Sequence, residues 1–97
     1  NAPEALLLSP EQSFFLRENL KLKLLNARLG LLSRQYDTVR TDLNQTAAAV
    51  RRYADPQSRK TQQLLQLLDQ AQQQLQKGEL PRLDASLAAL ATAAAGR

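Results

Sequence analysis

Cysteine, histidine, methionine and tryptophan are all absent from this sequence of 97 residues. Their absence excludes disulfides, thiolate nucleophiles and the usual side-chain ligands of zinc, copper and haem. Glycine is scarce, and Gly30, Gly78 and Gly96 are isolated, so no glycine-rich loop is available to hold a phosphate. No nucleophile stands with a base, and no two carboxylates are spaced to converge. The sequence therefore predicts no catalytic, cofactor-binding or metal-binding residues.

Neither sign of charge is gathered into a block, because the 13 basic and 9 acidic residues are scattered and leave a net charge of +4. This pattern does not indicate a nucleic-acid partner. No apolar run approaches the ~20 residues of a membrane span, so we expect membrane contact only through a segment outside this sequence. Residues 1–8 precede any periodic pattern. We interpret them as an N-terminal tail or expression remnant, and residues 9–97 as one domain of a longer protein.

Apolar periodicity predicts four helices, over about 10–33, 36–54, 56–77 and 80–95. Ser9 is a favoured N-cap before Pro10, and Gln12 completes a capping box. Asp55 followed by Pro56 repeats this start signal for the third helix. Short turns between the helices predict an all-α fold of two antiparallel helical hairpins.

An internal repeat emerges when the sequence is shifted by 44 residues. Apolar residues then coincide in pairs: Leu20 and Leu64, Leu24 and Leu68, Ala27 and Ala71, Leu31 and Leu75, Leu43 and Leu87. The pattern is compatible with a small bundle, with a tetratricopeptide-like pair of hairpins, or with chance similarity between leucine-rich helices. Two repeats are fewer than the ~3 that usually stabilise a solenoid. We therefore expect a second copy or another part of the protein to cover an open apolar face.

The segment from residue 14 to residue 34 is apolar on two sides of a helix. One row consists of Leu16, Leu20, Leu24, Ala27 and Leu31. A second row consists of Phe15, Leu22, Leu25, Leu29 and Leu32. A helix that needs cover on two sides either lies centrally in the fold or offers one side to a partner. We predict that Leu22, Leu25, Leu29 and Leu32 form an interaction surface for a protein partner or for self-association, and core packing of this row is the alternative.

Four arginines are weak candidates for anion contacts: Arg17, Arg28, Arg51 and Arg52. Arg51 and Arg52 fall in the last turn of a predicted helix, where the helix dipole favours cations without any ligand. Arg17 is followed by Glu18, and consecutive residues on a helix point in different directions. Solvated side chains or structural ion pairs are therefore the expected roles.

The segments SPEQ (9–12), FLRENL (15–20) and LLNARL (24–29) resemble the C-terminal helical region of HemX proteins, bacterial proteins labelled uroporphyrin-III C-methyltransferases. The segment RRYAD (51–55) is similar to the family's Tyr-Phe-Asp segment, with Ala54 in place of the phenylalanine. The resemblance implies a longer protein with one membrane-spanning helix. It also implies that this domain faces the periplasm at the bacterial inner membrane.

Three functions remain open at this point. The first is a non-enzymatic interaction or scaffold domain, without a cofactor, in a membrane-anchored envelope protein associated with tetrapyrrole (haem) biosynthesis. The family label implies the second, C-methylation of uroporphyrinogen III with S-adenosylmethionine. Tetrapyrrole methyltransferases are α/β proteins with glycine-rich loops, so we do not expect this chain to transfer methyl groups. The third is a tetrapyrrole carrier whose arginines pair with carboxylates.

Overall fold

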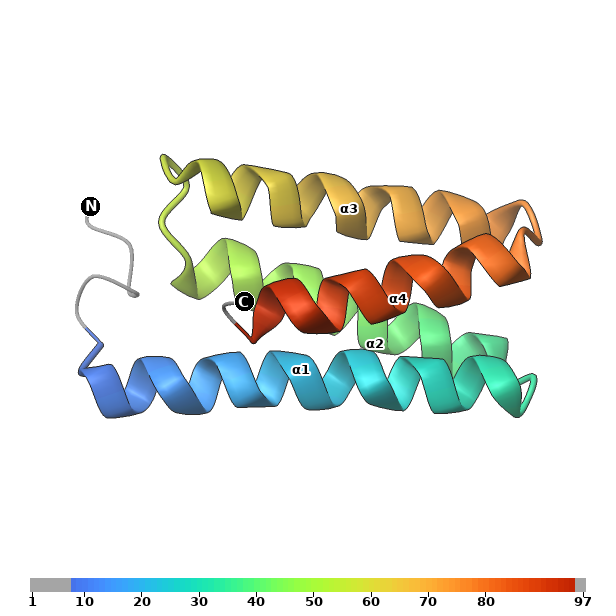
Figure 1. The fold of residues 1–97 in the computed structure, drawn as a ribbon, viewed down its shortest axis with the longest axis horizontal. Helices are drawn as coiled ribbons and strands as arrows, with labels where there is room; N and C mark the ends of the chain where they lie inside the picture. The colour runs from blue at the N-terminus through green and yellow to red at the C-terminus, as the bar shows by residue number, and fades with distance from the viewer. Residues whose placement is uncertain (1–7, 96–97) are drawn as a thin grey trace.

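The computed structural model describes residues 8–95, and within this range it has four helices and no strand. The helices are α1 (Pro10–Leu32), α2 (Tyr36–Tyr53), α3 (Arg59–Gln76) and α4 (Leu80–Ala94). Consecutive helices run antiparallel, with α1 and α3 at opposite corners of the bundle (Figure 1). The predicted all-α fold of two hairpins is confirmed. The predicted N-terminal tail lies, apart from Leu8, outside the described residues.

The two hairpins close into a four-helix bundle. Helix α1 packs against α2 and α4, and α3 packs against the same two helices. Leucines from all four helices meet in the core, where Leu24, Leu43, Leu68 and Leu87 are at most 1% exposed. Of the two architectures that the sequence left open, the structure shows the bundle. Helix α4 covers the inward side of α1, so the inner apolar row of α1 has its cover within residues 8–95.

The start of α1 follows the predicted capping chemistry. The Gln12 backbone N–H donates to Ser9 Oγ at 3.1 Å, and the Ser9 backbone N–H donates to Gln12 Oε1 at 2.9 Å. Pro10 occupies the first helical position, where no backbone donor is needed. This reciprocal pair satisfies two backbone donors at the helix start.

The start of α3 differs from the prediction, since the helix begins at Arg59 and not at residue 56. Asp55 Oδ1 accepts from the Gln57 backbone N–H at 2.9 Å, which holds residues 55–57 in a turn. Ser58 is the N-cap, and its Oγ accepts from the Thr61 backbone N–H at 3.4 Å. An aspartate before a proline favours a turn as readily as a helix start, and here the turn forms.

The two hairpin turns are equivalent at a shift of 44 residues. Arg34 has φ 59° and Gly78 has φ 71°, so the same position of each turn is left-handed. The next residue donates its backbone N–H to the fifth carbonyl before it: Gln35 to Gly30 at 2.7 Å, and Glu79 to Gln74 at 2.9 Å. This is the Schellman pattern that ends many helices. The repeat thus extends from the apolar positions to the backbone geometry of the turns.

Candidate interaction surface

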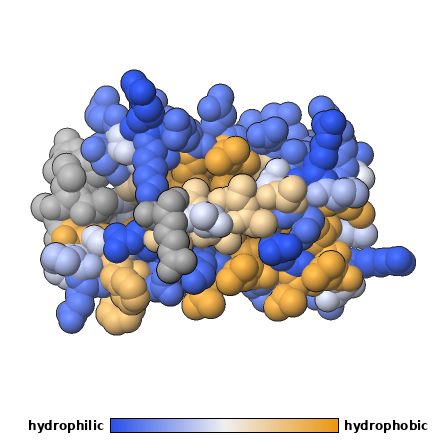
Figure 2. All heavy atoms as spheres, in the orientation of Figure 1, coloured by the Kyte–Doolittle hydropathy of each residue, from blue (hydrophilic) through white to orange (hydrophobic). Residues whose placement is uncertain are grey.

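Helix α1 carries leucines on two sides, and the bundle covers one of them. The inner row, Leu20, Leu24, Ala27 and Leu31, is buried against α2 and α4. The outer row consists of Phe14, Phe15, Leu22, Leu25, Leu29 and Leu32, all of which are exposed. Exposure in the outer row ranges from 37% at Leu25 to 74% at Leu32. Figure 2 shows apolar side chains gathered along the edge of the molecule that α1 forms.

Helix α3 shows what the same outward positions carry in the second hairpin. The equivalents of Leu22, Leu25, Leu29 and Leu32 are Gln66, Asp69, Gln73 and Gln76, and all four are exposed. The inward positions, in contrast, stay apolar in both helices, as with Leu24 and Leu68. The hairpin architecture therefore forms with polar side chains on its outer side. Folding of the bundle does not account for the leucines of the outer row.

The outer row has the spacing of a helix-packing seam. Leu22, Leu25, Leu29 and Leu32 follow each other at intervals of three, four and three residues. Steps that average 3.5 residues keep side chains along one line that a second helix can follow. Continued towards the N-terminus, the line passes through Glu18 and reaches Phe15. Glu18 is therefore the single charged position in the row.

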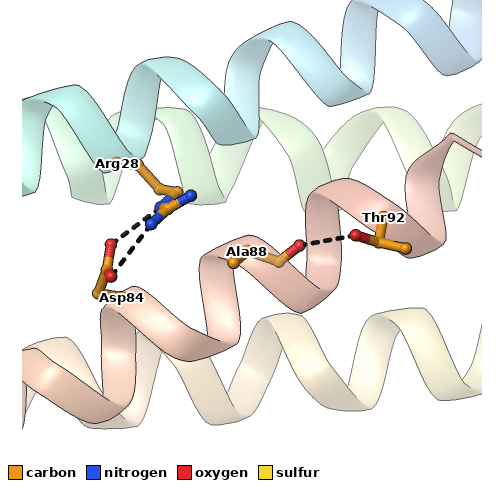
Figure 3. Close-up of polar contacts among 4 residues, drawn as sticks. All are labelled: Arg28, Asp84, Ala88 and Thr92. Carbon is orange, nitrogen blue, oxygen red and sulfur yellow. Dashed lines mark hydrogen bonds and ion pairs between the residues drawn. The ribbon is translucent and has the colours of Figure 1, made fainter.

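An ion pair joins α1 to α4 beside the outer row (Figure 3). Arg28 donates from Nε to Asp84 Oδ1 at 2.9 Å and from Nη2 to Oδ2 at 3.1 Å. These hydrogen bonds and the Arg28 charge hold the pKa of Asp84 below its usual value, against the opposite effect of burial. The pKa of Arg28 is raised by the same contact. Arg28, a predicted anion contact, is thus already paired with a carboxylate of its own chain.

A shallow groove of about 280 Å³ runs between α1 and α4 next to this ion pair. Lys21, Leu25 and Arg28 line it from α1, and Ala88 and Thr92 are among the residues that line it from α4. Leu25 belongs both to the outer row and to the groove. The small side chains of α4 leave room beside the row for another helix to approach.

The opposite border of the outer row carries amides and one cation, Lys23, whose Nζ donates to Gln45 Oε1 on α2 at 2.9 Å. Asn26 donates from Nδ2 to Asp42 Oδ2 on α2 at 2.7 Å, so this border faces α2. Asn19 lies two helical turns before Asn26 and lines a groove of about 380 Å³ with Phe15 and Tyr53. The outer row is therefore bordered by Lys21 and Arg28 on the α4 side, and by amides with Lys23 farther from the row on the α2 side.

The other candidate arginines are spread over the surface. Arg17 is exposed on α1, and Arg51 and Arg52 are exposed in the last turn of α2. The Arg52 guanidinium lies 5.3 Å from the centroid of the Tyr53 ring. Among the three grooves described in residues 8–95, one contains any of the four predicted arginines, and that arginine is Arg28. These grooves do not bring the four together as an anion site.

The largest described groove, of about 740 Å³, lies between α2 and α3. Tyr36, Arg40, Leu75 and Lys77 are among its lining residues. By the 44-residue shift, this groove is the counterpart of the contact between α1 and α4, with Arg40 in the place of Asp84. The ion pair that joins α1 to α4 therefore has no equivalent at this position.

Sequence reasoning missed three features of this surface: Phe14, Lys21 and the ion pair of Arg28 with Asp84. Phe14 was not assigned to either row, although it stands 11 and 18 residues before Leu25 and Leu32, spacings that bring residues to the same side of a helix. The pairing of Arg28 with Asp84 joins residues 56 positions apart, and no local pattern reveals it. Lys21 is a candidate contact because α4 packs beside it and forms the groove that Lys21 lines.

Comparison with known proteins identifies the family. A family model described as "HemX, putative uroporphyrinogen-III C-methyltransferase" matches residues 1–97, the whole chain. The chain belongs to the HemX family. No curated protein and no solved structure matches it. The family label relates the chain to tetrapyrrole biosynthesis.

The described part of this HemX-family chain offers two further observations. None of its helices is long and apolar enough to cross a membrane. Within residues 8–95, no group of three or more acidic side chains is placed to hold a metal ion.

Proposed function

We propose that this chain is a non-enzymatic interaction domain whose working surface is the outer row of α1. The observation that carries the proposal is the contrast between α1 and α3, which have equivalent places in the fold. Helix α3 presents glutamine and aspartate outward, whereas α1 presents leucine and phenylalanine. A run of six large apolar side chains on one exposed helix face is typical of a binding surface. Removing this row from water by association would be favourable.

The setting that we propose is the periplasmic side of a bacterial inner membrane, in an envelope protein anchored by a segment outside this sequence. The resemblance to HemX proteins implies this setting, and the match of the whole chain to the family supports that resemblance. In this proposal, the family's link to tetrapyrrole biosynthesis belongs to the complex that the domain helps to assemble and not to a reaction of the domain itself. Methyl transfer is not part of the proposal, since the chain offers no glycine-rich loop for S-adenosylmethionine.

Site-specific photocrosslinking in the protein as cells make it tests the proposal. A photoreactive residue at position 29 lies in the outer row, and one at position 73 is the matched control, because Gln73 is the α3 equivalent of Leu29. We expect protein adducts at position 29 and none at position 73. A Leu25→Asp change in the same chain should remove the adducts while helicity is retained. Equal adducts at both positions, or none at position 29, would refute the proposal.

A second candidate, tetrapyrrole binding, is favoured by the groove between α2 and α3. Leu75, Leu80 and the cations Arg40 and Lys77 line this groove, which suits a flat ligand that carries carboxylates, although such a ligand would compete with Asp37 for Arg40. Titration of a carboxylated porphyrin should then shift the porphyrin absorbance, and Arg40→Ala should reduce the shift. An Arg17→Ala variant, altered outside this groove, is the control. An unchanged absorbance would remove this candidate and leave the interaction domain untouched.

A further inference from the structure

We infer that the outer row of α1 binds one amphipathic helix of another protein, whose apolar seam is bordered by acidic residues on the side that faces α4. The inference rests on the proposed function and names the partner chemistry. It follows from three properties of the surface: the spacing of its leucines, the charges along its borders, and the groove at α4.

The spacing selects a helix as the occupant. Leu22, Leu25, Leu29 and Leu32 lie along one line at steps of three and four residues. A second helix with the same 3.5-residue period can insert its side chains between them along the whole line. The groove between α1 and α4 then receives one flank of that helix, because Ala88 and Thr92 keep the α4 side low.

The border charges select an acidic flank. Lys21 and Arg28 stand on the α4 side of the row and line the groove that the partner would enter. Arg28 already shares its charge with Asp84, so Lys21 is the stronger source of positive potential at this border. On the opposite border Asn19 and Asn26 are uncharged, and Lys23 lies farther from the row, with its Nζ donating to Gln45 on α2. A partner with glutamate or aspartate beside its seam on the α4 side therefore complements this surface.

Two of the ways in which a second copy of the chain could pair with the outer row are unfavourable. If two outer rows pair in parallel, Glu18 faces Glu18 of the second copy. If they pair antiparallel with Leu22 facing Leu25, then Glu18 faces Leu29, and Lys21 shares a border with Arg28 of the second copy. Both of these arrangements are unfavourable, because they place like charges together or a carboxylate against leucine. The antiparallel register in which Leu25 faces Leu29 carries Glu18 past the end of α1, so dimerisation is measured as an outcome of the test.

An anionic membrane surface also fits less well. Glu11 and Glu18 fall within the same arc of the helix as the outer row, at the end where Phe14 and Phe15 lie. Insertion of this face into anionic lipid would bring both carboxylates against like charge. A partner helix can place a polar residue opposite Glu18, so a helix matches the outer row better than a lipid surface does.

Two designed helical peptides test the inference by fluorescence anisotropy with the 97-residue chain. Both have the same isoleucine and leucine seam of about three heptads with one glutamine at the layer of Glu18, and one is bordered by glutamate and the other by lysine. We expect the glutamate peptide to bind more tightly than the lysine peptide. Lys21→Glu should weaken the glutamate peptide by about five- to tenfold and should strengthen the lysine peptide. Lys60→Glu on α3, with the same change in net charge, should leave both affinities unchanged.

Four results would overturn the inference: equal binding of the two peptides, no binding of either, equal effects of Lys21→Glu and Lys60→Glu, or dimerisation through the outer row at the peptide-binding concentration. Vesicles of phosphatidylglycerol that bind the chain more tightly than the glutamate peptide does would assign the row to the membrane instead. If neither peptide binds but photocrosslinking still gives protein adducts at position 29, the acidic partner is refuted and the proposed function stands. Failure of both experiments would refute the proposed function as well.

Discussion

The two hairpins of this chain have the same geometry and different outer surfaces. Their turns place a left-handed residue at the same position, Arg34 in one and Gly78 in the other, and their inward leucines fill one core. The outward side of the first helix is apolar in the first hairpin and rich in glutamine in the second. The second hairpin thus acts as an internal control. It separates the residues that the fold requires from those that it merely tolerates.

The largest difference in the free energy of unfolding is expected between replacing an inner leucine of α1 and replacing an outer one. Leu24 is fully buried, and Leu24→Ala should lower the free energy of unfolding by about 2–5 kcal/mol through lost burial and a residual cavity. Leu29 is 63% exposed, and Leu29→Ala should change that free energy by at most about 0.5 kcal/mol. Urea unfolding of the two variants measures both values. Equal losses would mean that the outer row belongs to the core of the folded chain.

An intermediate effect is expected at the turns, where the two hairpins differ in residue type at one backbone geometry. A side chain at a left-handed position costs about 1 kcal/mol, so Gly78→Ala should destabilise the chain by about that amount. Arg34→Gly should stabilise it by about 0.5 kcal/mol, since the gain is reduced by the greater freedom of glycine in the unfolded chain. Thermal unfolding compares the two variants. Shifts of the same sign would show that the turns are not equivalent.

The smallest effect is expected at the ion pair between α1 and α4, which is half-exposed. The pKa of Asp84 is lowered by Arg28, so the folded chain binds a proton at Asp84 less readily than the unfolded chain does. The stabilisation is complete above the usual aspartate pKa of about 3.9 and is lost as the pH falls through the lower pKa of the folded state. Asp84→Asn should remove this part of the acid dependence. If the free energies of unfolding of the original chain and of Asp84→Asn change with pH in the same way, the stabilising role of the ion pair is contradicted.

Sequence reasoning reached the helices because their signals are local. The capping residues Ser9 and Gln12 indicate the start of α1, and the turn glycine Gly78 indicates the end of α3, each to within about a residue. The start of α3 was missed because Asp55 and Pro56 satisfy a turn and a helix start alike, and the choice depends on Ser58 taking the cap.

The candidate surface was predictable in its leucines but not in its setting. Two apolar rows on one helix indicate that one row needs a partner. The sequence does not show which of the two rows the bundle covers. That outcome depends on α4 packing against α1, a contact between residues more than 50 positions apart. The charged border at Lys21 and the groove beside it follow from the same packing.

The central claim, that the outer row serves a partner and not the fold, is tested most directly by giving α1 the outward residues of α3. The variant Leu22→Gln, Leu25→Asp, Leu29→Gln, Leu32→Gln exchanges each leucine for its equivalent at a shift of 44 residues. We expect its free energy of unfolding to stay within about 2 kcal/mol of the original chain. Binding of the glutamate-bordered peptide should be lost. Loss of the folded state, or peptide binding at the original affinity, would contradict the claim.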